Sequence, residues 1–480
     1  MSEPAPPDAA PPAPPPLPTS STVSNSPEEP PTVFAGTIIA WTVIVLAVAA
    51  LLVGRVVREK SRGDPDAKSQ GDVAAELSMR IIGRYAVGAK LLMRSLPGGN
   101  QEQQVAQLAG QVEQLARESP VNRVRGAPVL AELVGAERAV KLLDGVETDK
   151  PEINEDVRDL GAIYADGPDA LDEEATRRLV ERHEWFGKLA VTWEKSDADP
   201  MRREALSAAR RTAVVALVAM LGGIGVGVIA LGLFVTAIIL LALGRIRRGY
   251  DERPVARARA GVYIEAFALY LGWFIGVSLV AGALGAREGN LKWFWIAVAG
   301  SAPLACLWPL VRGVSFAELR RGLGWHRGRG WVREIGAGVG GYVAGLPVIV
   351  AGIVITAVLS RFMGEQPTHP IVEEITGRLP DVLKLLLLAS VYAPLAEETM
   401  FRGALYHGVR ARLPFVVAAL LVAFIFAVIH PQGLAAVPAL MGIAIVLASL
   451  REWRGSIVAP VVAHAINNGV ILILLVLAIG

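Results

Sequence analysis

The chain has 480 residues, of which 53% are hydrophobic and 19% are charged. Soluble proteins carry roughly 45–50% and 25% of these classes, so much of the apolar surface must face lipid, as in an integral membrane protein. The single cysteine, Cys306, excludes a disulfide framework and multi-cysteine metal sites, and a net charge of +2 gives no indication of nucleic-acid binding.

The chain begins with a tail and a membrane span. Residues 1–33 are predicted to form a disordered tail, because residues 1–31 hold twelve prolines and neither lysine nor arginine. Residues 34–54 carry no charge and are long enough to cross a ~30 Å hydrocarbon core. Four basic residues follow at once, so the positive-inside rule places the tail outside and residue 55 in the cytoplasm. These residues are Arg55, Arg58, Lys60 and Arg62.

Residues 55–211 are charged and are predicted to form a small helical soluble domain on the cytoplasmic side. Four apolar residues recur on one helical face, namely Val105, Leu108, Val112 and Leu115. The segment contains no metal-ligand cluster, phosphate-binding loop or nucleophile motif. We therefore expect it to serve in regulation or in contacts with an unknown protein partner.

Residues 212–259 combine a long apolar stretch with a basic loop. Thr212–Gly244 has no charge and would measure ~50 Å as one helix, too long for an untilted span and short for two. Four glycines lie at its middle, namely Gly222, Gly223, Gly225 and Gly227. Either a hairpin or one long helix is consistent with this length. The hairpin fits the charges better, because it places the later arginine-rich loops in the cytoplasm with residue 55.

Further apolar stretches occupy residues 260–480 and predict an all-helical, polytopic membrane protein. They lie at 261–285, 293–311, 334–360, 381–396, 415–430, 434–450 and 456–479.

Ionisable groups inside a membrane are costly, so each is a candidate functional residue. The last hundred residues hold such a group in three helical motifs, E-E-x-x-x-R, F-x-x-x-H and H-x-x-x-N. The candidates are Glu397, Glu398, Arg402, His430, His464 and Asn468.

Helical geometry predicts that these residues meet. Arg402 lies four residues after Glu398, so the two can pair on one helix face. Pro394 is expected to kink or break the incoming helix and to leave both glutamates in the first turn of the half-helix that follows. This half-helix and the next helix each run ~22 Å to a shared turn, which brings Glu397 and His430 to one depth. Asn468 follows His464 by one turn on the same face.

A second copy of the glutamate motif serves as a control. Glu373, Glu374 and Arg378 have the same spacing but lie in a polar loop without apolar flanks. The spacing alone is therefore weak evidence, and the position of residues 397–402 inside an apolar helix is what distinguishes them.

The three ordered motifs resemble the CAAX protease and bacteriocin-processing (CPBP, Abi-type) family of intramembrane endopeptidases, over about residues 260–480. The resemblance implies that Glu397 and His430 activate a water and that His464 and Asn468 stabilise the oxyanion. It implies that Glu398 and Arg402 orient the first carboxylate. Zinc, held by Glu397, His430 and His464, and a metal-free glutamate mechanism are both open.

The sequence thus predicts a multi-pass intramembrane endopeptidase that hydrolyses a peptide bond in a membrane-associated substrate, with prenylated CAAX-type proteins as one candidate class. One alternative is an inactive relative that serves as an immunity or scaffold protein. Another is a proton-coupled transporter, in which the same ionisable groups would relay protons.

Overall fold

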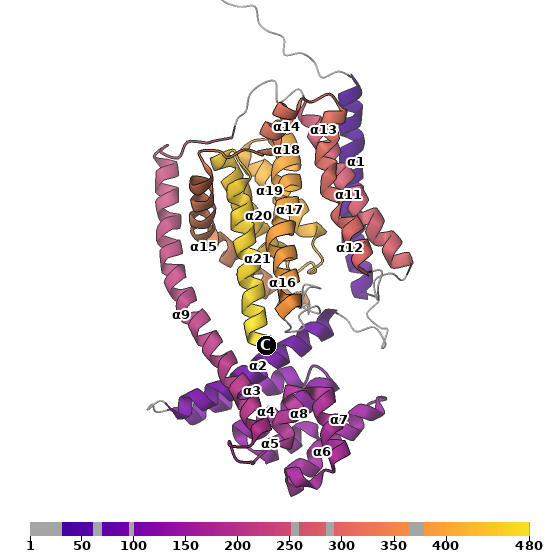
Figure 1. Ribbon diagram of the computed structural model, residues 1–480, viewed down its shortest axis with the longest axis vertical. Coiled ribbons are helices and arrows are strands. Elements are labelled where there is room, and N and C mark those ends of the chain that lie inside the picture. The colour runs from indigo at the N-terminus through magenta and orange to yellow at the C-terminus, as the bar shows by residue number, and fades with distance from the viewer. Residues whose placement is uncertain are drawn as a thin grey trace, which may run out of the picture.

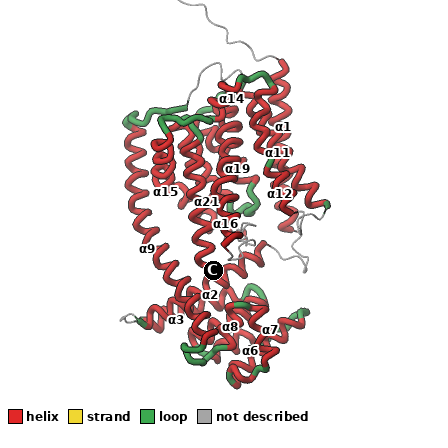
Figure 2. Tube along the Cα trace, in the orientation of Figure 1, coloured by secondary structure: helices red, strands yellow, loops and turns green. Residues whose placement is uncertain are grey.

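The protein is described from a computed structural model, which covers residues 31–60, 70–95, 100–250, 259–284, 292–363 and 379–479. Within these ranges the chain forms helices and short connections and no strand, which confirms the predicted all-helical fold. Figures 1 and 2 show a bundle of long helices with a compact helical domain at one end. The Pro-rich segment 1–30 and the control motif at 373–378 lie outside the described residues.

The compact domain follows the first membrane helix, α1 (Pro31–Lys60). Its core includes Leu130, Leu160 and Leu179, all almost fully buried. The predicted apolar face of 105–115 packs onto this core, with Val112 completely buried. The domain's helices are α2 (Gln70–Arg94), α3 (Gln101–Ala116), α4 (Pro120–Val134), α5 (Ala136–Leu143), α6 (Pro151–Asp166), η1 (Pro168–Ala170), α7 (Glu173–His183) and α8 (Trp185–Val191).

The hairpin predicted within 212–244 is wrong. The structure has one continuous helix there, α9 (Pro200–Ala242), which leaves the soluble domain and runs the length of the bundle (Figure 1). Backbone groups at bilayer depth need partners inside their own segment, and a helix supplies them where a hairpin turn would not. The four central glycines therefore stay helical, with open space around each position.

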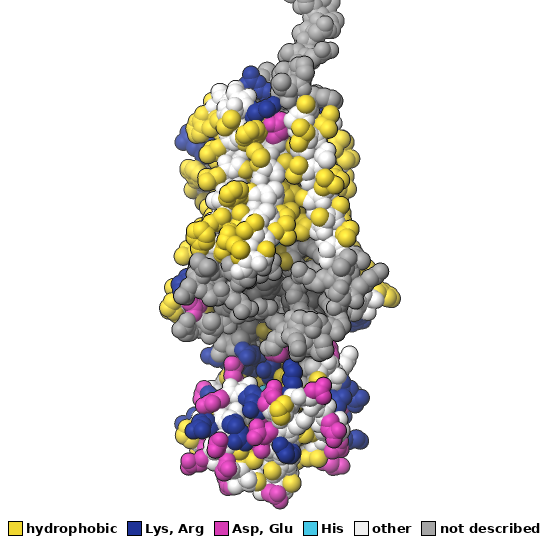
Figure 3. Space-filling model, turned by 90° about the vertical axis from the view of Figure 1, so that its right-hand side faces the viewer, with side chains coloured by type: hydrophobic (Ala, Val, Ile, Leu, Met, Phe, Trp, Pro, Cys, Tyr) yellow, Lys and Arg dark blue, Asp and Glu magenta, His cyan; other side chains and the backbone are white. Residues whose placement is uncertain are grey.

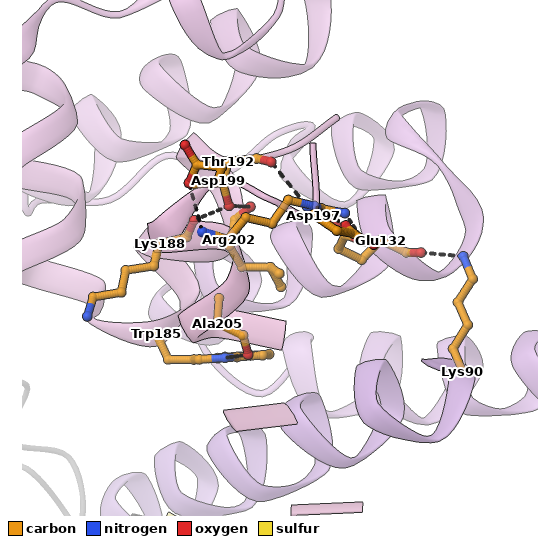
Figure 4. Close-up of polar contacts among 10 residues, drawn as sticks. Lys90, Glu132, Trp185, Lys188, Thr192, Asp197, Asp199, Arg202 and Ala205 are labelled. Atoms are coloured by element: carbon orange, nitrogen blue, oxygen red, sulfur yellow. Dashed lines mark hydrogen bonds and ion pairs between the residues drawn. The ribbon is translucent and has the colours of Figure 1, made fainter. Parts of the chain in front are cut away.

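The start of α9 is fixed to the soluble domain by buried polar contacts (Figure 4). Arg202 donates to the Glu132 carboxylate at 2.6 Å and to the Thr192 carbonyl at 3.1 Å. The Trp185 indole donates to the Ala205 carbonyl at 2.8 Å. The soluble domain and the membrane-spanning part of α9 thus share one uninterrupted helix.

Seven helical stretches among the described residues are long and apolar enough to cross a membrane, in agreement with a multi-pass membrane protein. Figure 3 shows apolar side chains over the bundle and charged ones over the soluble domain. The remaining helices are α11 (Ala260–Ala283), α12 (Lys292–Gly300), η2 (Ala302–Leu307), α13 (Trp308–Val311), α14 (Phe316–Leu323), α15 (Trp331–Met363), α16 (Leu379–Leu387), η4 (Leu388–Tyr392), α17 (Ala393–Glu398), η5 (Thr399–Leu405), α18 (Tyr406–Arg410), α19 (Phe415–Ile429), α20 (Val437–Arg454) and α21 (Val458–Ile479).

The end of the bundle that carries α14, here called the distal face, lies opposite the soluble domain (Figure 1). Several chain segments meet there, since Gly249 donates to the Glu452 carbonyl and Ile457 to the Gly324 carbonyl. Helix α19 starts near this face and measures only ~22 Å, so it ends inside the bundle. The segment 430–436 then turns the chain back into α20 at that depth (Figure 2).

Candidate active site

The two glutamates lie in a helix that changes its winding twice. A kink or a break was predicted at Pro394. The chain stays helical from Leu379 to Arg410, so the break is wrong. Two π-helical segments, η4 and η5, flank the short α-helix α17 that carries Glu397 and Glu398. Pro394 lies in α17, and the carbonyl four residues before it, which a proline cannot bond, belongs to η4. Segments of π-helix are frequent at functional sites.

Glu398 is the centre of a buried polar cluster. Its side chain is fully buried, and its Oε1 accepts from Arg402 at 2.9 Å, as the spacing predicted. The same oxygen lies 2.9 Å from Nδ1 of His464. Arg402 also donates to the Ala444 carbonyl at 3.1 Å. Glu398 therefore holds His464 directly, whereas the resemblance implied that it holds Glu397.

Glu397 faces both histidines. Its Oε2 lies 3.7 Å from Nε2 of His430 and 3.9 Å from Nε2 of His464. These distances are too long for direct hydrogen bonds, and Oε2 is buried with no hydrogen-bond partner among the described residues. The predicted meeting of Glu397 and His430 at one depth is confirmed. The gap among the three groups matches the reach of a bridging water.

The hydrogen-bond partners of the two imidazole rings determine which nitrogen of each ring carries the proton. Nδ1 of His430 lies 2.6 Å from the Phe426 carbonyl oxygen, which can only accept, so Nδ1 carries the proton. Nδ1 of His464 faces the Glu398 carboxylate in the same way. In the neutral form of each ring, Nε2 is therefore an acceptor directed toward the gap beside Glu397.

Asn468 lies on α21 one turn beyond His464, as the sequence predicted, and its amide is held by neighbours. Its Nδ2 donates to the Ala389 carbonyl at 2.9 Å. Its Oδ1 accepts from Asn467 at 3.2 Å, and Asn467 accepts from the Tyr342 hydroxyl at 3.4 Å. The second Nδ2–H of Asn468 has no hydrogen-bond partner among the described residues. Sequence reasoning missed these supports, although a second asparagine directly before Asn468 was a visible signal.

Aromatic rings enclose the cluster on its distal side. The Arg402 guanidinium stacks 4.8 Å from the Phe426 ring, whose centroid is 4.2 Å from that of His430. Phe401 packs edge-on against Phe426 at 5.0 Å. Residues Thr399–Arg410 are all buried, so the site is closed toward the distal face. Glu397 and the residues before it keep more exposure, and its side chain is 23% exposed.

Glu397, His430 and His464 are also the predicted ligands for zinc. Among the described residues, no group of three or more histidine, cysteine, aspartate or glutamate side chains has an arrangement that could hold a metal ion. Zinc at these three residues stays a prediction from the sequence.

Comparison with known proteins supports the resemblance. Residues 379–470 match the family model described as type II CAAX prenyl endopeptidase Rce1-like, and this segment contains all six candidate residues. Over this segment, the chain resembles the CAAX prenyl endopeptidases. The match favours a hydrolase of the protease type in general.

A curated relative gives further similarity without a function. The chain is 27% identical over 129 residues to an uncharacterized 24.3 kDa protein of Escherichia coli. The alignment covers 25% of this chain and 59% of that relative. No solved structure matches the chain.

Proposed function

We propose that the protein is an intramembrane endopeptidase that hydrolyses a peptide bond in a membrane-associated protein or peptide, with prenylated CAAX-type substrates as the first class to test. The proposal rests on one observation. The unpartnered Glu397 Oε2 faces Nε2 of both histidines, at 3.7 and 3.9 Å, inside a largely buried cluster.

In this proposal a water occupies the gap beside Glu397 and donates to Glu397 and to Nε2 of His430. Peptide hydrolysis needs a base for the water, a donor for the oxyanion and a proton for the leaving amine. Glu397 takes the proton as the water attacks the carbonyl carbon. It then returns that proton to the amine as the C–N bond breaks.

The oxyanion needs donors on the opposite side of the carbonyl. Asn468 has one N–H left after its bond to the Ala389 carbonyl. His464 can donate from Nε2 when it carries a second proton, and the Glu398 carboxylate at its Nδ1 would balance that charge. Arg402 fixes Glu398 and so positions His464 through it.

Cleavage of defined peptides tests the proposal. The protein is purified in detergent and incubated with matched prenylated and unprenylated C-terminal peptides, and products are identified by mass spectrometry. We expect cleavage of at least one peptide by the wild-type protein and none by Glu397→Gln. Equal product from both proteins would contradict the assignment. A parallel sample with a chelator tests zinc, which stays a prediction from the sequence.

We also propose that the soluble domain is cytoplasmic, where an unknown protein could bind it. The flanks of α1 support this side, because four basic residues follow the span and none precedes it. With α9 as one crossing, the arginines of the distal face then lie outside. Some of them are neutralised by buried carboxylates, since Arg410 pairs with Glu452 and Arg454 with Glu334 at 2.9 and 2.7 Å.

A further inference from the structure

Ser390 carries a buried hydroxyl that the proposed mechanism does not use. Its Oγ has no hydrogen-bond partner among the described residues, although it is shielded from solvent. Buried hydroxyls in native proteins are nearly always hydrogen-bonded, so an unpaired one calls for a cause. A bound ligand that supplies the missing partner is one such cause.

Ser390 lies next to the Asn468 amide. Asn468 donates to the carbonyl of Ala389, the residue before Ser390. A Cβ added to Gly469, the residue after Asn468, would lie 3.3 Å from the Ser390 hydroxyl. The hydroxyl and the proposed oxyanion donor therefore occupy neighbouring positions between η4 and α21.

Ser390 lies in η4, seven residues before Glu397 on the same continuous helix. Residues Thr399–Arg410 are all buried, whereas Leu387, Val391 and Leu395, on the Ser390 side of Glu397, are exposed. The π-helical winding of η4 is a further feature of ligand-contacting segments.

We propose that Ser390 is a substrate-binding residue, whose hydroxyl hydrogen-bonds the backbone of an extended peptide beside the bond to be cleaved. This inference rests on the proposed function. The hydroxyl can donate to a peptide carbonyl or accept from a peptide N–H, so it recognises main chain rather than a particular side chain. It binds substrate and transition state alike and takes no part in proton transfer.

The experiment compares Ser390→Ala with Ser360→Ala. Ser360 on α15 is a matched control, because its hydroxyl is also buried and without a partner among the described residues. Loss of a hydrogen bond made equally in the ground and transition states raises KM and leaves kcat unchanged. We expect Ser390→Ala to raise KM about three- to tenfold. Ser360→Ala should leave both constants unchanged, and neither variant should lower the melting temperature, since neither loses a protein partner.

A second measurement separates this inference from the proposed function. Binding of a fluorescent peptide is measured on the Glu397→Gln protein, with and without Ser390→Ala, where no cleavage is needed. A peptide affinity weakened about three- to tenfold supports the binding role even if the wild-type protein cleaves nothing. A KM and an affinity equal to those of the Ser360→Ala control would overturn it, whatever the wild-type activity.

Discussion

Two adjacent glutamates have different roles because their surroundings differ. Glu398 is fully buried and its Oε1 is shared between Arg402 and His464. Glu397 is partly exposed, and its Oε2 has no partner among the described residues. The Glu398 carboxylate holds two neighbours through Oε1, although its Oε2, like that of Glu397, has no hydrogen-bond partner among the described residues. The Glu397 carboxylate is available to a water, and substitutions should separate the two.

Glu397→Gln and His430→Ala should each reduce proteolysis by about a hundred- to ten-thousandfold, because a general base contributes about that much to the rate. The Glu397 side chain faces the gap beside the histidines, whereas the His430 ring also packs on the buried Phe426 ring, with centroids 4.2 Å apart. The melting temperature of the Glu397→Gln protein should therefore stay close to that of the wild-type protein. Turnover near the wild-type rate in the Glu397→Gln protein would show that another group is the base.

Glu398→Gln should instead destabilise the protein. Removal of one partner of a buried ion pair costs about 3–5 kcal/mol, because the other charge is left buried without compensation. Here that charge is Arg402, which is fully buried. Thermal unfolding in detergent would detect the loss, with Glu397→Gln as the matched control. Unchanged stability would mean that Arg402 finds another partner.

The control motif allows a test of the site's location. Glu373→Gln combined with Glu374→Gln should leave activity within a few-fold of wild type, since the sequence around them is polar and solvated charges contribute little. The peptide-cleavage assay measures this directly. A loss of activity as large as that of Glu397→Gln would show that the catalytic carboxylate belongs to the motif at 373–378 and not to the motif at 397–402.

At the scale of single residues, the sequence predicted the contacts that follow from helical spacing. The Glu398–Arg402 pair and the approach of Glu397 to His430 depend on local geometry and were correct. The supports of Asn468 were missed. Tyr342 is 125 residues away from Asn467, so only the packing of α15 against α21 brings the two together.

Among the elements, the errors came from treating proline and glycine as helix breakers. Pro394 lies in a continuous helix with π-helical segments on both sides, and the glycines 222–227 lie within α9. Inside a membrane, unpaired backbone groups cost more than a poor helix former does, so the helix persists. Helix propensities measured in water-exposed helices therefore predict poorly where these membrane helices end.

The start of α9 offers a test of how the soluble domain is attached. Arg202→Met should destabilise the soluble domain by up to about 3 kcal/mol, the lower end for a buried pair, because it leaves the partly buried Glu132 carboxylate without its guanidinium. Arg203→Met is the matched control, since the neighbouring Arg203 is exposed and its side chain donates to the Ala198 carbonyl rather than to a carboxylate. Limited proteolysis and thermal unfolding would compare the two. Equal unfolding temperatures and equal proteolysis rates of the two variants would contradict the role of Arg202 in fixing α9 to the soluble domain.

For the whole molecule, a pair of introduced cysteines tests the orientation in the membrane. The native Cys306 is buried, so the wild-type protein gives the background. Lys141→Cys lies on the exposed surface of the soluble domain, and Arg327→Cys on the exposed distal face. With a membrane-impermeant thiol reagent on intact cells, we expect Arg327→Cys to react and Lys141→Cys to react only after lysis. The reverse pattern would place the soluble domain outside.

The helices of the bundle differ in length, and this has a consequence for the surrounding lipid. The uncharged part of α9, residues 212–242, measures ~46 Å, whereas α19 measures ~22 Å, against a hydrocarbon thickness of ~30 Å. A bilayer adapts to such mismatch by thickening around a long helix and thinning around a short one. The membrane beside α19 should therefore be the thinnest around the protein. Water would have less hydrocarbon to cross there on its way to the gap beside Glu397. Lipids with longer acyl chains should therefore slow the proposed peptide hydrolysis.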